Sequence, residues 1–235
     1  MSKTVLITGG AVRLGRGITE YFLKQNWKVA VHYYKSEKQA KELAETNAVN
    51  LHRADLSTSK GRNKLVQSIQ SQYDQLYGLV NNAGIFREVD LNQVNEEDWT
   101  RSLEINARSP FELSRQLAPL LKPVRGAIVQ ITDAALRRPY RNYLPYFVSK
   151  GALHTLTKGL ARALGPEIRV NAVAPGPIEF PADTSEKKKN EIIEKTILQR
   201  KGNRKEIAQA VYFLLAQATY TTGEFLRVDG GRNLT

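Results

Sequence analysis

The sequence predicts an α/β protein built around one doubly wound parallel sheet with helices on both faces. Short apolar runs alternate along the chain with longer segments in which apolar residues recur at helical spacing, as do Leu14, Ile18 and Phe22. This alternation is typical of consecutive strand–helix–strand units. The chain of 235 residues is long for one domain but short for two. We therefore expect a single domain over residues 1–235, with a sheet of about seven strands.

The expected elements follow one another in a regular order. Short apolar runs predict strands over Thr4–Thr8, Lys28–Tyr34, Ala48–Arg53, Leu76–Asn81, Ala127–Ile131, Arg169–Ala172 and Phe225–Val228. Helical spacing predicts helices over Leu14–Gln25, Glu37–Glu45, Ser59–Tyr73, Glu97–Leu121, Pro145–Leu164 and Lys205–Ala216. The segment 176–200 is rich first in proline and then in charge, and it fits neither pattern. We expect it to form a substrate-facing lid, since such insertions often carry specificity.

Composition narrows the class of protein. The chain has no cysteine, which excludes disulfides, thiolate metal sites and a cysteine nucleophile, and we expect no metal. It has no apolar run long enough to cross a membrane, and Met1 leads almost directly into a strand, so we expect a cytoplasmic protein without a signal peptide. The formal net charge is +12, but the basic residues are spread along the chain. This favours attraction of anionic small molecules over a nucleic-acid partner.

A glycine-rich turn follows the first expected strand and leads into an amphipathic helix. It reads Thr8-Gly9-Gly10-Ala11-Val12-Arg13-Leu14-Gly15. Glycine lets the backbone approach a pyrophosphate at a helix N-terminus, where free N–H groups and the helix dipole attract anions. The turn therefore predicts a dinucleotide site with Gly9, Arg13, Leu14 and Gly15 among its contacts. An ordinary strand–helix loop is the alternative interpretation.

The residues that end the second strand favour NADPH over NADH. An enzyme that uses NAD needs a carboxylate here to bind the ribose 2′-hydroxyl, and the run from His32 to Ser36 contains none. Lys35 and Ser36 instead offer a cation and a hydroxyl suited to a 2′-phosphate, with Arg13 nearby in the expected fold. A solvated lysine that begins a helix is the alternative interpretation of Lys35.

The next two strands also end in small or polar residues. Asp55 and Leu56 follow the third strand, where we expect them to meet the adenine. Asn82, Ala83 and Gly84 follow the fourth strand and permit close approach of a nucleoside. Open α/β sheets bind ligands in the crevice outside the carboxyl ends of their strands. These residues are therefore expected to line one cofactor cleft.

A tyrosine and a lysine one helical turn apart predict acid–base chemistry. Tyr146 and Lys150 open the helix that begins at Pro145, so they share one face. A phenol has a pKa near 10, and a neighbouring ammonium at a helix N-terminus lowers it. The pair would then act as a general acid toward a developing anion. A chance surface pair is the alternative, which the dinucleotide turn upstream disfavours.

The chain resembles the short-chain dehydrogenase/reductase family over essentially its whole length. The resemblance rests on the glycine turn, Asp55, Asn81–Gly84, Asn106, Tyr146 and Lys150, Asn171, Pro175-Gly176, Thr222-Gly223 and Asp229-Gly230-Gly231. It implies a Rossmann-type fold in which Tyr146 donates the proton, Lys150 binds the nicotinamide ribose, and Asn106 supports a proton-relay water. Pro175 and Gly176 join the cofactor contacts by the same resemblance. A buried polar residue at a helix bend is the alternative for Asn106. The resemblance also implies a homotetramer.

One departure from the family pattern concerns the substrate. The family expects a serine thirteen residues before the tyrosine, and this chain has Asp133. A carboxylate donates no hydrogen bond to a ketone unless it is protonated, but it can position a proton beside a ring nitrogen. Asp133 with Arg13 resembles the pteridine reductase branch. That branch also carries a His-Tyr-x-basic-Ser run, matched here from His32 to Ser36, and a stacking aromatic, matched by Phe86. The resemblance thus adds His32 and Tyr34 to the expected cofactor contacts.

These residues together predict that hydride from NADPH reduces a C=N bond of a dihydropterin or dihydrofolate. Arg13 would contact both the pyrophosphate and the substrate, and Arg137, Arg138 and Arg141 could meet an anionic tail, although a solvated basic loop is the simpler interpretation. An NADPH-dependent carbonyl reductase, for example one acting on 3-oxoacyl thioesters, is the alternative enzyme. A non-catalytic NADPH-binding regulator and a nucleic-acid-binding protein are the alternatives from other classes.

Overall fold

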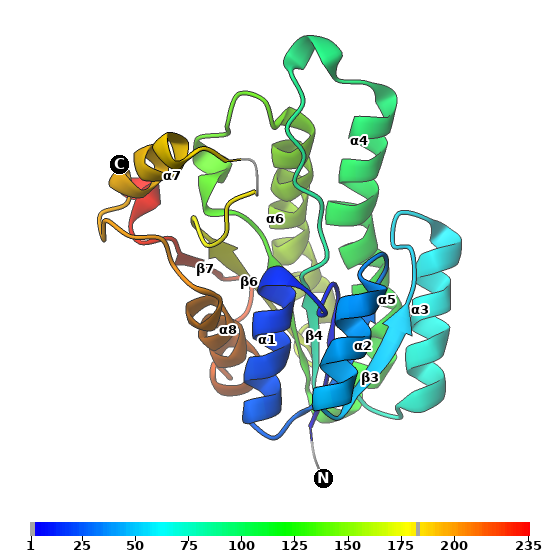
Figure 1. Cartoon of the computed structure of the whole chain (residues 1–235). Coiled ribbons are helices and arrows are strands. Elements are labelled where there is room, and N and C mark those ends of the chain that lie inside the picture. Colours follow the sequence, from blue (N-terminus) through cyan, green and yellow to red (C-terminus); the bar gives the residue numbers. More distant parts are fainter. Residues whose placement is uncertain (1–2, 182–183) are drawn as a thin grey trace.

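Seven parallel strands form the sheet of the computed structural model, which describes residues 3–181 and 184–235 (Figure 1). The strands are β1 (Thr4–Ile7), β2 (Lys28–Tyr33), β3 (Val49–Arg53), β4 (Gly78–Asn81), β5 (Ala127–Ile131), β6 (Arg169–Pro175) and β7 (Phe225–Val228). Their order is β3-β2-β1-β4-β5-β6-β7, which reverses direction between β1 and β4. A ligand crevice forms at such a reversal in open α/β sheets. The predicted doubly wound fold is confirmed.

Eight α-helices in the described part of the chain connect these strands and cover the sheet. They are α1 (Arg13–Lys24), α2 (Glu37–Thr46), α3 (Ser59–Gln72), α4 (Glu96–Leu103), α5 (Ser109–Leu121), α6 (Leu144–Leu164), α7 (Glu186–Glu194) and α8 (Arg204–Tyr212). Apolar residues of α1, α2 and α8 cover one face, and those of α3, α5 and α6 cover the other. Within the described residues, no helix is long and apolar enough to span a bilayer.

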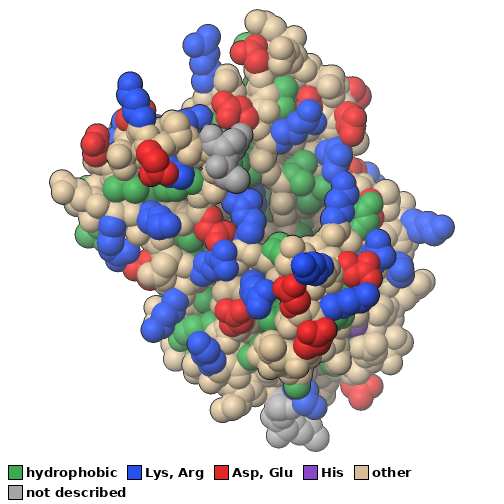
Figure 2. All heavy atoms as spheres, in the orientation of Figure 1, with side chains coloured by type: hydrophobic (Ala, Val, Ile, Leu, Met, Phe, Trp, Pro, Cys, Tyr) green, Lys and Arg blue, Asp and Glu red, His purple; other side chains and the backbone are tan. Residues whose placement is uncertain are grey.

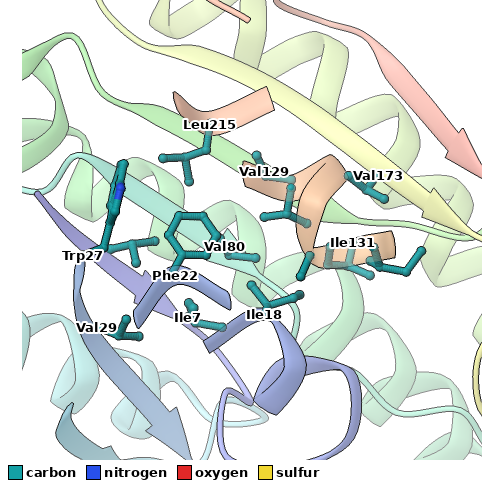
Figure 3. Close-up of a cluster of buried hydrophobic side chains, with 14 of the residues drawn as sticks. Ile7, Ile18, Phe22, Trp27, Val29, Val80, Val129, Ile131, Val173 and Leu215 are labelled. Atoms are coloured by element: carbon teal, nitrogen blue, oxygen red, sulfur yellow. The ribbon is translucent and has the colours of Figure 1, made fainter. Parts of the chain in front are cut away.

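Two apolar layers lie on opposite sides of the sheet because neighbouring residues of a strand point to opposite faces. Ile7 of β1 and Val80 of β4 pack with Phe22 of α1 in one layer (Figure 3). Leu6 and Leu79, one position earlier on the same strands, belong to the other layer. All five side chains are fully buried. The central strands are therefore covered on both faces, which leaves the strand ends as the place for a site.

Two segments differ from the prediction. The helix predicted over Glu97–Leu121 is interrupted by a π-helical turn, Glu104–Arg108, between α4 and α5. The segment 176–200 was predicted without regular structure, yet it contains α7, whose Ser185 side chain caps the Lys188 N–H. None of the residues of α7 is buried, so its sequence has no apolar stripe that could reveal a helix. Residues 182–183 of this segment lie outside the described residues.

Candidate active site

The turn between β1 and α1 is anchored to the end of β4. The Thr8 hydroxyl oxygen accepts hydrogen bonds from the N–H groups of Asn82 and Ala83, at 3.0 and 2.9 Å. The Asn82 amide donates back to the Thr8 carbonyl at 2.8 Å. Gly9 has a φ of +62°, and a Cβ on Gly15 would lie 2.0 Å from the Gly9 carbonyl oxygen. The predicted glycines are therefore required by the shape of the turn, and the N-terminus of α1 stays open beside it.

His32 supports this turn from β2. Its Nδ1 accepts a hydrogen bond from the Gly9 N–H at 3.1 Å, and its Nε2 lies 3.1 Å from the Ala54 carbonyl oxygen. Because a backbone N–H donates to Nδ1, the ring proton belongs on Nε2, which donates to Ala54. Burial lowers the pKa of His32 to about 4, so the ring is neutral. Both of its nitrogens bind the protein, so His32 shapes the turn; its expected contact with the cofactor stays a prediction.

Arg13 begins α1 with a left-handed backbone, at a φ of +51°. Its Nε lies 3.4 Å from the carboxylate of Glu179, and its side chain is 62% exposed. Glu179 also forms an ion pair with Arg204 at the start of α8. The guanidinium of Arg13 thus stands at the predicted phosphate site, while its ion pair joins that site to the segment 176–200. Leu14, the next residue, is half-buried.

The predicted ribose end of the cleft carries an exposed cation. Lys35 is exposed, and its Nζ lies 5.8 Å from the centre of the Tyr34 ring. Ser36 is the N-cap of α2 but makes no side-chain capping hydrogen bond. The Tyr34 hydroxyl donates a hydrogen bond to Asp55, which raises the pKa of Tyr34. A lysine and a serine at the end of β2 therefore face solvent, as a 2′-phosphate site requires.

Two charged residues that the sequence did not single out, Arg62 and Glu104, hold the turn after β3, which is predicted to meet the adenine. Arg62 is buried and donates hydrogen bonds to the Leu56 carbonyl at 2.9 Å and to Glu104 at 2.6 Å. Glu104 is the first residue of the π turn. The turn that carries Asp55 and Leu56 is thereby tied to the helix beside the catalytic residues. An arginine on an amphipathic helix gives no sequence signal for this role.

Tyr146 and Asp133 are directly hydrogen-bonded. The Tyr146 hydroxyl donates to one Asp133 oxygen at 2.6 Å, and the other oxygen accepts the Ala135 N–H at 2.7 Å. Lys150 is buried one helical turn after Tyr146 and donates to the Ile131 carbonyl at 2.6 Å. Three of the four residues predicted as catalytic, Asp133, Tyr146 and Lys150, therefore lie together at the carboxyl end of β5.

The pKa values of these groups shift in a common direction, toward the uncharged forms. Burial raises the pKa of Asp133 and lowers that of Lys150 to about 8. Burial, followed by the neighbouring Asp133 charge, raises the pKa of Tyr146 well above 10. We expected Lys150 to lower the pKa of Tyr146; the pKa shifts upward instead, because burial, and after it the Asp133 charge, disfavours the phenolate. The proton therefore stays on the phenol until a stronger acceptor than Asp133 arrives.

Asn106 lies in the middle of the π turn and is fully buried. Its side-chain oxygen accepts the Ile85 N–H at 2.9 Å, and its nitrogen donates to the Ile85 carbonyl at 3.0 Å and to the Ser149 hydroxyl at 2.9 Å. A Cβ on Gly84 would lie 3.0 Å from the Asn106 side-chain oxygen. Asn106 therefore fixes the loop after β4 against the helix that carries Tyr146 and Lys150.

Phe86 and Tyr143 form an aromatic wall beside Tyr146. The Phe86 ring is stacked on Tyr143, with centroids 4.3 Å apart and planes at 16°, and it meets the Tyr146 ring edge-on at 4.7 Å. The Tyr143 hydroxyl donates to Glu88 at 2.9 Å. Phe86 is 42% exposed, so part of the predicted stacking residue stays accessible. Tyr143 was not predicted as a site residue, although it lies three residues before Tyr146 at the start of the same helix, a spacing that could have suggested it.

The remaining predicted residues lie at the same edge of the sheet. Pro175 ends β6, and the N–H of Gly176 donates to the Val228 carbonyl at 3.0 Å. A Cβ on Gly176 would lie 2.5 Å from the Cα of Asp229, so this position needs glycine. Arg137, Arg138 and Arg141 are exposed on the loop between Asp133 and Tyr146.

Comparisons with known proteins agree with this geometry. A family model described as enoyl-(acyl carrier protein) reductase matches residues 10–233. The uncharacterized oxidoreductase YmfI of Bacillus subtilis is 34% identical, over 98% of this chain and 99% of its own length. The dihydromonapterin reductase of Klebsiella pneumoniae is 30% identical, over 99% and 97%. The 3-oxoacyl-(acyl-carrier-protein) reductase of Chlamydia muridarum is 32% identical, over 98% and 97%.

Proposed function

Because the chain belongs to the short-chain dehydrogenase/reductase family and is an oxidoreductase that uses NAD(P), we propose that it reduces a C=N bond of a dihydropterin with NADPH. The observation that carries the proposal is the hydrogen bond between Tyr146 and Asp133. In this arrangement the hydroxyl proton of Tyr146 lies between the phenol oxygen and the Asp133 carboxylate. A ring nitrogen that gains negative charge can take this proton, whereas a ketone oxygen would meet a repelling carboxylate.

The residues of the cleft fit NADPH. The close approach of Gly9 and Gly15 and the open N-terminus of α1 suit a pyrophosphate. Arg13 is the cation beside it, and Lys35 and Ser36 would hold the 2′-phosphate. When bound, NADPH supplies the hydride. Asp55 and Leu56 would contact the adenine, and Lys150 would hydrogen-bond the nicotinamide ribose while its charge stabilises the anion that forms during proton transfer.

A charge reversal at Lys35 tests the cofactor. Lys35→Glu should raise the KM for NADPH about tenfold or more, because it removes a charge-assisted hydrogen bond and adds repulsion. The KM for NADH should change little or fall. Lys38→Glu, which alters an exposed lysine in the first turn of α2, is the matched control. Equal effects of both variants on NADPH would contradict the assignment of Lys35.

The relatives differ in the class of substrate that they reduce. Dihydromonapterin reductases and 3-oxoacyl-(acyl-carrier-protein) reductases have similar identity to this chain, so overall similarity does not decide between pterin and thioester. Asp133 supports the pterin, and so does Phe86, whose accessible ring could stack on a flat heterocycle. Arg13 beside the pyrophosphate site would be able to reach such a ring as well.

The deciding experiment compares NADPH consumption with dihydrobiopterin, dihydrofolate and a 3-oxoacyl thioester at matched concentrations. We expect kcat/KM for a pterin to exceed that for the thioester at least about tenfold, a difference of about 1.4 kcal/mol in transition-state binding. The opposite order would assign the chain as a carbonyl reductase. Absence of turnover with all three would favour the non-catalytic regulator.

We also propose that the chain forms a homotetramer in the cytoplasm and that the segment 176–200 acts as a lid. Exposed apolar side chains on the helices that would form the subunit contacts support the tetramer: Leu103, Phe111, Leu144 and Val148. The link from Glu179 to Arg13 supports the lid, since it joins that segment to the cofactor turn. Light scattering on the purified protein tests the tetramer, and a monomer at micromolar concentration would contradict it.

A further inference from the structure

A pocket adjoins the aromatic wall formed by Phe86 and Tyr143. This pocket of about 290 Å³ lies between the loop after β4 and α4. Its apolar lining comes from Ile85, Phe86, Val89 and Pro145. The polar residues that line it are Arg87, Arg101, Ser102 and Asp98, the last of which is paired with Arg87. On the face drawn in Figure 2, a hollow with hydrophobic side chains inside is flanked by Lys and Arg side chains.

The pocket adjoins the catalytic centre, because two of its lining residues, Phe86 and Pro145, lie next to Tyr146. Phe86 lines the pocket and meets the Tyr146 ring edge-on at 4.7 Å. Pro145, which also lines it, directly precedes Tyr146. A volume of about 290 Å³ is at the lower limit for a whole ligand but fits one arm of a larger one. A substrate that stacks on Phe86 could therefore extend into this space.

The two arginines differ in how firmly they are held. Arg87 lies 2.6 Å from Asp98, whose carboxylate is almost fully buried and also accepts the Asn95 N–H. That pair neutralises a buried charge and would be costly to break. Arg101 lies 3.5 Å from Glu97, and both side chains are largely exposed, at 43% and 70%. Arg101 also interacts electrostatically with Asp55, which follows β3. Exposed pairs of this kind contribute less than about 1 kcal/mol each, so Arg101 can turn to another anion at little cost.

We propose that this pocket binds a carboxylate-bearing arm of the substrate, with Arg101 as its principal anion contact. The inference rests on the proposed pterin reduction and narrows it to pterins that carry an acidic substituent, as folates do. The apolar lining suits an aromatic or aliphatic linker, and a planar guanidinium suits a carboxylate at its end. Arg137, Arg138 and Arg141 do not line the pocket, so they are the competing site for the same charge.

Two substrates that share a ring but differ in their side arm provide the test. Arg101→Gln should raise the KM for dihydrofolate about tenfold, the low end expected for a hydrogen bond to a charged group, and leave the KM for dihydrobiopterin unchanged. Arg115→Gln is the control, since Arg115 is also exposed, pairs with Glu112 on α5 and lies outside the pocket. An equal change for both substrates would overturn the proposal. So would an effect on dihydrofolate found in Arg141→Gln and absent in Arg101→Gln.

A binding measurement separates this inference from the proposed function. N-(4-aminobenzoyl)-L-glutamate represents the arm alone and can be titrated calorimetrically into the full chain without any turnover. Binding to the wild type that weakens about tenfold in Arg101→Gln supports the pocket even if no pterin is reduced, in which case only the proposed function fails. If pterins are reduced but the fragment does not bind, or binds equally to Arg101→Gln, the pocket assignment fails and the pterin assignment stands.

Discussion

The Tyr146 hydroxyl donates a 2.6 Å hydrogen bond to Asp133, thirteen residues earlier in the chain. The second oxygen of this carboxylate is held by the Ala135 N–H, so Asp133 cannot turn away from the tyrosine without losing a hydrogen bond. Charge on Asp133 opposes ionisation of the phenol, and burial opposes charge on both groups. The pair therefore holds its proton tightly and releases it only to a basic acceptor.

Replacing Asp133 with serine should change the preferred acceptor. In Asp133→Ser, kcat for dihydropterin reduction should fall at least about 100-fold, because the ring nitrogen loses the group that positions its proton. A serine hydroxyl can donate to a carbonyl oxygen, so reduction of a 3-oxoacyl thioester should be unaffected or improve. Steady-state NADPH consumption measures both. Pterin turnover at the wild-type rate in this variant would refute the role of Asp133.

The pH dependence of catalysis should show an upper limb near the pKa of Lys150, about 8. Below this pH the ammonium is charged and can stabilise the anion that forms as the proton leaves Tyr146. Above it the group is neutral, and kcat should fall as the pH rises from about 7 to 10. In Lys150→Arg, any remaining activity should lack this limb, because arginine stays charged.

Lys158→Met, a change of an exposed lysine on the same helix, is the control for that profile and should retain the limb. If Lys150→Arg keeps a limb at the wild-type position, another group titrates there.

His32 should make the folded state sensitive to acid. Its pKa is about 4 in the folded chain and near 6.5 when unfolded, so the unfolded state binds the proton more readily. The stability linked to His32 is therefore fully present above about pH 6.5 and is lost as the pH falls toward 4, by about 3 kcal/mol in all. Urea unfolding at pH 7 and pH 5 should show a larger loss for the wild type than for His32→Asn. The same loss in both proteins would exclude His32 as its source.

Two glycines in helices should respond in opposite ways to a methyl group. Gly15→Ala places a Cβ 2.0 Å from the Gly9 carbonyl, so the turn must move, and the Kd for NADPH should rise at least about tenfold. Gly159→Ala on α6 meets nothing within 4 Å, and it should stabilise the protein by up to about 1 kcal/mol. Calorimetric titration and thermal unfolding check the pair. Unchanged NADPH binding in Gly15→Ala would mean that the cofactor does not use this turn.

The sequence predicted where the site lies better than how its residues are held. Gly9, Asp55 and Asn82 each follow a strand, and a parallel sheet brings such positions to one edge, so their convergence needed no knowledge of contacts. The hydrogen bonds of His32 could not be predicted, because a buried histidine gives the same sequence signal whether it binds a ligand or the backbone. The upward pKa shift of Tyr146 depends first on its burial and then on the neighbouring Asp133 charge, neither of which sequence fixes.

Other features had no local sequence signal at all. The pairing of Arg62 with Glu104 joins residues 42 positions apart on different helices. The ion pair of Arg13 with Glu179 spans 166 positions, so no window of sequence contains both partners. The helix α7 has no buried side chain, so its sequence lacks the periodic apolar residues that would predict a helix. Long-range charge pairs and solvated helices are the parts that require a structure.

The π turn around Asn106 also bears on how this enzyme could be redesigned. A π turn accommodates one residue more than the regular helix on either side of it, so deleting a single residue within Glu104–Arg108 would allow α4 and α5 to join as one continuous helix. Helical pairing would improve, yet Asn106 would lose its place in the turn and with it the hydrogen bonds to Ile85 and Ser149. We therefore expect selection for thermal stability alone to favour that deletion, and the resulting protein to be more stable but inactive.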